Sequence, residues 1–283
     1  MLEVPRRLQQ VAVALPATLT QGIPHLREKT GRLGFILRAL AIFRVEKVIV
    51  YLDQENNKAR LEAKLMEKIL KFQETPPYLR KQIFPPDRDF AYTGTLPPLR
   101  TPHHPDRTGP ARGLLREAIA ISSGPVSSVD AGFSSPVIVR ERLEPGKRYT
   151  IRIRTPGQTP EAEIVDRAGL PIYWGPEVRR DDRPLEQIMK QSDRDLTIST
   201  ARQGTDIREI MDPLRSAWRT SRRPLVIFGS PTEGIQEILA RSGPKIPEAD
   251  FNINTVPDQG VETVRTEEAL LSTLAVLNLF VEN

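Results

Sequence analysis

"QVAVALPATL" (residues 10–19) and "EKVIVYLD" (residues 46–53) are the stretches that decide the fold. Each is a short, nearly continuous run of apolar and β-branched residues, which is typical of a strand buried on both faces. A helical spacing of apolar residues follows each run, over residues 25–45 and 56–74. Strand, helix, strand and helix in this order predict an α/β fold with a parallel sheet covered by helices on both faces.

The same alternation returns in the last third of the chain, so we expect about five buried strands in this sheet. The apolar spacing predicts helices and strands in turn at 184–192 (helix), 195–201 (strand), 206–222 (helix), 224–230 (strand), 232–243 (helix), 249–257 (strand) and 266–280 (helix). Gly243 is expected to close the third of these helices.

The middle of the chain has a different pattern. A Pro-dense stretch from residue 76 supports little regular helix, and short alternating runs separated by Gly, Pro and Ser follow it. This pattern predicts a small antiparallel, OB-like β-barrel at 90–176, inserted into an α/β domain that is formed by residues 1–89 and 177–283. His103 and His104 are expected in an exposed Pro-rich loop rather than on a metal.

The composition excludes several classes of site. The chain has 283 residues, no Cys and three His, so disulfides, thiolate zinc sites and Cys nucleophiles are excluded and no metal site is expected. No apolar run reaches the roughly 18 residues of a membrane span, and the first residues do not form a signal peptide. We therefore expect a cytoplasmic protein with no membrane partner. The net charge of +5 is clustered, which favours an acidic partner.

Two polar loops follow predicted strands, at the sheet edge where open α/β sheets bind ligands. In the first loop, Ser230 as N-cap, Pro231 and Glu233 predict a capping box, and Gly229 and Gly234 would let backbone approach a ligand. The second loop, "VPDQG" at 256–260, precedes a helix that Thr266 can cap. Its Pro, Gly and amide groups suit an uncharged or zwitterionic ligand. From the residues alone, this ligand and a plain helix start are equally good explanations.

Three stretches, taken in order around a β-rich insert, resemble a known family. They are "GRLGFILRALAIFRVEKVIVY" (31–51), "FGSPTEG" (228–234) and "FNINTVPDQGVETVRTEEALL" (251–271). They resemble the archaeal and eukaryotic branch of SPOUT-superfamily RNA methyltransferases that carries an OB-like insertion. The resemblance implies a deep trefoil knot in the C-terminal part of the sheet, an S-adenosylmethionine site in the knotted loops, and an obligate homodimer.

Carried over by position, the resemblance implies a cofactor site and a partner-facing arginine. One wall would consist of Phe228, Gly229, Ser230, Glu233 and Gly234, and the rest of Asn254, Val256, Pro257, Gln259, Gly260 and Thr263, with Arg265 nearby. The family's arginine in the first helix, which faces the partner's cofactor, matches Arg38 best. The alternative is that Arg32, Arg38 and Arg44 form the solvated face of an amphipathic helix.

Methyl transfer from a sulfonium requires mainly alignment of the nucleophile, the methyl group and the leaving sulfur. Uridine N3 is protonated at neutral pH, so Asp258 or Glu262 could take its proton and Arg38 could stabilise the anion. The absence of Cys excludes thiolate-assisted methylation of pyrimidine C5 and leaves N- or 2′-O-methylation. Eukaryotic members of the family are associated with N3-methyluridine in large-subunit rRNA, which favours that product.

Clustered arginines predict RNA binding, mainly through phosphates and with strong salt dependence. The candidate residues are Arg32, Arg38, Arg100, Arg112, Arg148, Arg152, Arg222 and Arg223. Two other functions stay open at this point. One is a non-catalytic RNA-binding or ribosome-assembly factor that keeps the fold. The other is a metabolic nucleotide-binding enzyme, which fits the basic barrel poorly.

Overall fold

The computed structural model describes residues 4–106, 108–191, 193–241 and 247–281, so the predicted helix end at Gly243 lies outside the described residues. By internal contacts the described chain divides into two compact units. The first contains residues 4–6, 75–88 and 99–175, and the second contains residues 7–74, 89–98 and 176–281, apart from the gaps given above. The predicted division into 1–89 with 177–283 and 90–176 stays a prediction of domain organisation.

The second unit is built on a six-stranded, wholly parallel sheet in the order β11-β9-β10-β1-β2-β8, which confirms the predicted α/β class. Its strands are β1 (Ala12–Pro16), β2 (Lys47–Tyr51), β8 (Glu177–Asp181), β9 (Leu196–Asp206), β10 (Pro224–Phe228) and β11 (Phe251–Asn254). The strand β8 was not expected from the sequence. Its residues, "EVRRD", are mostly charged, and it can be so polar because it lies at an edge of the sheet.

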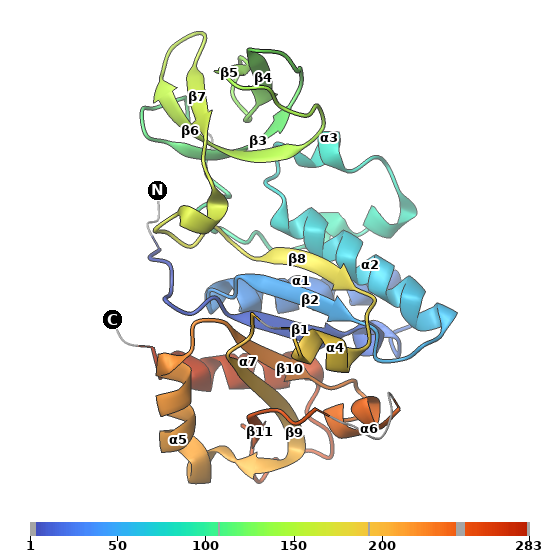
Figure 1. The fold of residues 1–283 in the computed structure, drawn as a ribbon. Coiled ribbons are helices and arrows are strands. Elements are labelled where there is room, and N and C mark those ends of the chain that lie inside the picture. Colours follow the sequence, from blue (N-terminus) through green and yellow to red (C-terminus); the bar gives the residue numbers. More distant parts are fainter. Residues whose placement is uncertain (1–3, 107, 192, 242–246, 282–283) are drawn as a thin grey trace. The chain divides into compact units, whose positions relative to one another are not determined.

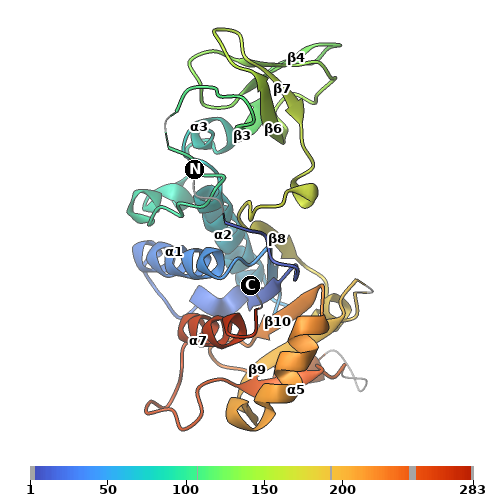
Figure 2. The ribbon, with the colours of Figure 1, turned by 90° about the vertical axis from the view of Figure 1, so that its left-hand side faces the viewer.

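Helices cover both faces of this sheet. On one face, Ala12, Ala14, Tyr51 and their neighbours form a buried cluster with α4 (Leu185–Met189) and α6 (Ile235–Ala240). The helices α1 (Leu26–Ile42), α2 (Asn57–Glu74) and α7 (Thr266–Asn278) cover the other face (Figure 1), and α1 lies beside both α2 and α7 (Figure 2). The helix α5 (Ile207–Thr220) contacts β9 and β11.

The first unit contains a closed five-stranded barrel in the order β3-β4-β5-β7-β6 (Figure 1). Its strands are β3 (Leu115–Ala120), β4 (Ser127–Asp130), β5 (Val137–Val139), β6 (Arg148–Thr155) and β7 (Glu161–Ile164). The pair β5 and β7 is parallel and the other four pairs are antiparallel. The predicted barrel is therefore present but mixed, because strand directions cannot alternate all the way around a closed ring of five.

Short helices and a buried histidine occupy the Pro-rich segment. The short elements are α3 (Arg80–Ile83), η2 (Arg88–Phe90) and η3 (Thr93–Thr95), and η1 (Ala17–Thr20) follows β1. The expectation that His103 is exposed was wrong, since it is fully buried beside Gly175 and its Nδ1 lies 2.9 Å from Thr101 Oγ1. Gly175 has a φ of +92°, and a Cβ there would lie 2.1 Å from the His103 ring.

The long strand β9 interrupts its pairing with β11 in the middle of the strand. Ser199 is paired with Asn252 of β11, but the next β11 residue, Ile253, is paired with Thr205. Residues 200–204 therefore form an excursion beside β11 rather than part of its ladder. The excursion returns at Gly204, where a Cβ would lie 2.5 Å from the Ile253 carbonyl carbon.

Replacing Gly204 with Ala should destabilise the protein, because backbone rather than a flexible side chain occupies the space of the new methyl group. We expect the free energy of unfolding in urea to fall by about 1–3 kcal/mol, as for other overpacked sites. Gly22→Ala is the matched control, since nothing lies within 4 Å of the position that its methyl group would take, and its effect should stay within about 0.5 kcal/mol. Equal effects at the two positions would contradict the close approach.

Candidate functional site

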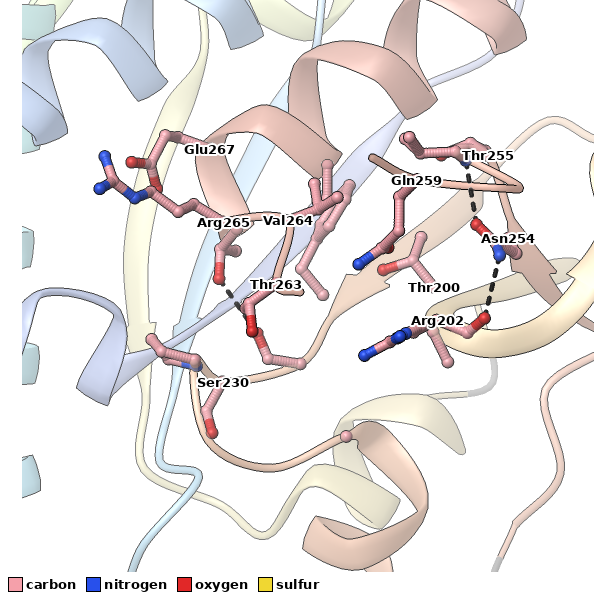
Figure 3. A pocket seen from close by; sticks show the side chains of 18 of the residues that line it. Thr200, Arg202, Ser230, Asn254, Thr255, Gln259, Thr263, Val264, Arg265 and Glu267 are labelled. Atoms are coloured by element: carbon pink, nitrogen blue, oxygen red, sulfur yellow. Dashed lines mark hydrogen bonds between the residues drawn. The ribbon is translucent and has the colours of Figure 1, made fainter. Parts of the chain in front are cut away.

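A cavity of about 370 Å³ lies at the carboxyl ends of β9, β10 and β11, where parallel sheets place their ligand sites. Its volume is in the range of small-molecule sites. The wall is made by the middle of β9, the loop after β10 and the loop between β11 and α7 (Figure 3), together with Arg32 of α1. Segments far apart in the sequence therefore meet at one edge of the sheet.

The cavity brings together nearly all the residues that the resemblance assigned to a cofactor site. The predicted residues that line it are Phe228, Gly229, Ser230, Glu233, Gly234, Asn254, Val256, Gln259, Thr263 and Arg265. Pro257 and Gly260 belong to the same loop but do not line the cavity. The role of these residues in holding a cofactor stays a prediction.

The loop after β10 does not form the predicted capping box. Ser230 Oγ accepts a hydrogen bond from Glu233 N at 3.0 Å, but Ser230 N also donates to Glu233 O at 2.9 Å, which closes a separate turn. The helix α6 begins only at Ile235, with Gly234 as its N-cap. A Cβ on Gly229 would lie 3.0 Å from Glu233 O, so this turn packs tightly against the end of β10.

The carbonyl group of Phe228 fixes this wall to the core. Tyr51 of β2 is fully buried and its hydroxyl donates a hydrogen bond of 2.8 Å to Phe228 O. Burial, followed by the nearby charge of Asp53, raises the pKa of Tyr51 well above its usual value, so the hydroxyl remains a donor. The loop that starts at Gly229 therefore leaves the sheet from a fixed point.

A hydrogen-bond network holds the loop between β11 and α7. Asn254 Nδ2 donates to Arg202 O at 2.9 Å and Asn254 Oδ1 accepts from Val256 N at 3.0 Å (Figure 3). Further along, Gln259 Nε2 donates to the carbonyls of Val261 and Glu262 at 2.8 and 3.0 Å, and Arg202 Nη1 donates to Glu262 O at 2.8 Å. The wall is therefore built from fixed polar groups.

The β9 residues of the cavity, Thr200, Ala201 and Arg202, were not predicted as site residues. The sequence did contain a signal, because the polar run "TARQG" directly follows a buried strand, as the two predicted loops do. Other lining residues that were not predicted as site residues are Pro231, Thr232, Ile253, Thr255, Val264 and Ala269.

The two candidate bases differ in position. Asp258 does not line the cavity; it has a positive φ of 55°, its side chain is 82% exposed, and its Oδ2 lies 2.9 Å from Arg208 Nη2. Hydrogen bonds to Asp206 and then to Asp258 raise the pKa of Arg208, and the hydrogen bond from Arg208 lowers the pKa of Asp206. Glu262 does line the cavity. Of the two candidates, therefore, Glu262 borders the cavity and Asp258 does not.

An ion pair between α1 and α7 forms another part of the wall. Arg32 Nε lies 3.1 Å from Glu267 Oε1, and both residues line the cavity.

The predicted cap of α7, Thr266, is the first helical residue instead. The N-cap is Arg265, whose backbone N–H donates to Glu268 Oε2 at 2.9 Å.

The arginines predicted to bind RNA do not form one group. Arg38 lies outside the cavity wall and its Nη1 donates to Pro98 O at 2.9 Å. In the barrel, Arg148 pairs with a buried glutamate of β3, and Arg152 pairs with a glutamate of β7 at 3.3 Å. The remaining candidates are exposed: Arg100, Arg112, Arg222 and Arg223.

Neither a metal cluster nor a membrane-crossing helix is found among the described residues. No group of three or more His, Asp or Glu side chains in this part of the chain could hold a metal ion. No described helix is both long enough and apolar enough to cross a membrane.

The chain is similar in sequence to several known proteins. The chain is 32% identical over 293 residues to an uncharacterized protein of Halobacterium salinarum, which covers 95% of this chain and 98% of that protein. It is 30% identical over 300 residues to the 28S rRNA (uridine-N(3))-methyltransferase of Homo sapiens, covering 94% of this chain and 77% of the human protein. The Drosophila melanogaster protein of the same name is 29% identical, and the aligned region covers 94% of this chain and 61% of the Drosophila protein.

A family profile described as putative RNA methyltransferase matches residues 10–277, which include the whole sheet, the barrel and every residue of the cavity wall. The chain therefore belongs to this family of RNA methyltransferases.

Proposed function

We propose that the protein transfers a methyl group from S-adenosylmethionine to N3 of a uridine in rRNA. The observation that carries this proposal is the cavity at the carboxyl edge of the sheet, in a chain that belongs to an RNA methyltransferase family. The uridine N3 target comes from relatives of about 30% identity that are named for this reaction on 28S rRNA.

The residues of the cavity fit this methyl donor. Thr200, Asn254 and Gln259 contribute uncharged polar groups that suit a nucleoside, and Phe228 and Ile253 contribute apolar surface. When bound, S-adenosylmethionine would supply an electrophilic methyl group on a sulfonium. The loops would orient it, and the Gly229 and Gly234 backbone would lie along it without obstructing side chains.

The acceptor needs a group that takes the N3 proton of uridine. We propose Glu262 for this role ahead of Asp258, because only Glu262 borders the cavity. We retain Arg38 as the arginine that faces the reacting base, acting at a partner subunit's site rather than at its own. Its position outside its own cavity is compatible with such a role.

We also propose the SPOUT architecture with its trefoil knot. The path of the chain supports it: β11 lies at the sheet edge beyond β9, and α7 then returns to contact β10 and α1. The knot would form where this return threads through the loop between β9 and β10.

A homodimer completes the proposal. The helices α1 and α7 contact each other, and both expose large apolar side chains: Phe35 and Ile42 on α1, Leu271 on α7 and Leu279 just after it. Exposed apolar side chains on two adjoining helices suit a self-complementary surface for a second copy of the chain.

The alternative is a non-catalytic RNA-binding or ribosome-assembly factor that retains the fold. It predicts that Gln259→Ala and Arg38→Ala leave cellular function intact although the cavity still binds a ligand. A methyltransferase predicts that both substitutions abolish the modification in the cell.

Donor binding tests the proposed cofactor site. Calorimetry with protein free of co-purified ligand should give a dissociation constant in the micromolar range, about −8 kcal/mol, for S-adenosylmethionine. Gly229→Arg should abolish the binding, because a side chain there enters the cavity wall. Gly22→Arg, which points into open space, should bind normally.

Nucleoside mass spectrometry of rRNA treated with enzyme and donor should then show N3-methyluridine, and a different methylated nucleoside would overturn the assignment of the target atom.

RNA binding should depend on salt through the exposed arginines. Replacing both Arg222 and Arg223 with Gln should reduce the slope of log K against log salt by about 1.4 for a single-stranded RNA, if each contacts one phosphate. Arg140→Gln is the control, because Arg140 is exposed but paired with Glu161 at 2.6 Å. An unchanged slope in the double variant would remove these arginines from the RNA surface.

Sedimentation velocity tests the dimer. The wild-type protein should sediment with twice the 31.9 kDa mass of one chain, and Phe35→Asp with Leu271→Asp should give a monomer. Leu61→Asp is the control, since Leu61 is 66% exposed on α2 and lies outside the proposed surface. A wild-type monomer, or a dimer that survives the double substitution, would exclude this interface.

A further inference from the structure

The ion pair between Arg32 and Glu267 engages only part of each side chain. Arg32 contributes Nε and Glu267 contributes Oε1, whereas a guanidinium and a carboxylate can form two parallel hydrogen bonds. Glu267 is nine-tenths buried, and its Oε2 is buried with no hydrogen-bond partner among the described residues. A buried carboxylate oxygen without a donor is unfavourable, so a ligand that donates a hydrogen bond to Oε2 would be favoured here.

The other charged groups of the cavity are satisfied or exposed. Glu233 pairs with Arg241, the Glu262 and Arg265 residues are exposed, and Arg202 donates to a backbone carbonyl. The two terminal nitrogens of Arg32 form no hydrogen bond to a carboxylate in the described part of the chain, and its side chain is 24% exposed. Arg32 and Glu267 together therefore present one unused positive group and one unused negative group.

The Arg32–Glu267 pair makes one end of the cavity chemically different from the other. Figure 3 shows Glu267 on one side of the site, and Asn254 and Gln259, with their uncharged amides, on the other side. Because those amides already bond to backbone groups, a ligand that fills the cavity would need an uncharged part at that end and a zwitterionic part at the other. The methyl donor of the proposed function has this chemistry, with a nucleoside joined to an α-amino acid.

We propose that Arg32 and Glu267 bind the amino-acid end of the donor, with Glu267 accepting hydrogen bonds from the α-ammonium group and Arg32 donating to the α-carboxylate. This inference rests on the proposed function and adds the orientation of the donor in its site. It assigns Arg32, which was expected to contact RNA, to donor recognition.

Binding of two nucleosides tests the inference without any need for catalysis. S-adenosylhomocysteine carries the amino-acid part and 5′-methylthioadenosine lacks it. Wild-type protein should bind the former at least about tenfold more tightly, since hydrogen bonds to charged groups contribute factors of this size. Glu267→Gln and Arg32→Gln should each reduce this ratio by about tenfold and leave the affinity for 5′-methylthioadenosine within about twofold.

Glu233→Gln is the matched control, because Glu233 also lines the cavity but is paired with Arg241; it should leave the ratio unchanged. A deaminated S-adenosylhomocysteine keeps the test independent of variant folding. The wild-type protein should bind this deaminated compound about tenfold more weakly than S-adenosylhomocysteine. The Glu267→Gln variant should bind the two compounds with equal affinity.

The outcomes separate the inference from the proposed function. If neither nucleoside binds the wild-type protein, both fail. If both bind and the ratio is the same in all variants, the donor site stands and the role of the pair is wrong. If Arg32→Gln weakens binding of single-stranded RNA while the nucleoside ratio is unchanged, the pair serves the RNA and the inference is again overturned.

Discussion

The position of β10 between β1 and β9 is the constraint on which the site depends. Because β10 pairs in parallel with both neighbours, its carboxyl end is level with those of strands that are distant in the sequence. The loop after β10 then leaves the sheet beside the loop after β11 and the excursion of β9. The hydrogen bond from Tyr51 to the Phe228 carbonyl ties this junction to β2, on the far side of β1.

The apolar helix α7 has two different tasks. Leu270, Leu274 and Leu277 are buried against the sheet and α1, whereas Leu271 on the same helix is exposed. At its start, the helix carries Glu267 into the cavity wall, in a first turn whose partial positive charge favours a carboxylate. The contrast between the polar loop and the apolar helix therefore follows from their places, since the loop borders a cavity and the helix closes the core.

Hydrophobic patterning predicted most of the sheet, because strands such as β1 and β10 are buried on both faces and must be almost wholly apolar. It could not predict the edge strand β8, whose residues are mostly charged, or the order of the strands, since pairing is decided by contacts between distant segments. The parallel pair in the barrel was missed for the same reason. Local capping rules failed at Ser230, because the same hydrogen bonds that cap a helix can also close an independent turn.

The candidate site was predicted mainly through motif resemblance and the rule that ligands bind at the carboxyl ends of parallel strands. That rule applies equally to β9, where the polar residues after the buried segment include Arg202. Arg32 shows the limit of interpreting charges from a sequence. As one of several arginines on an amphipathic helix it resembled a solvent-facing or RNA-binding residue, and only the packing of α1 against α7 places it beside Glu267. The same positive charge can serve a phosphate backbone or a single carboxylate, and its neighbours in space, not in sequence, decide between them.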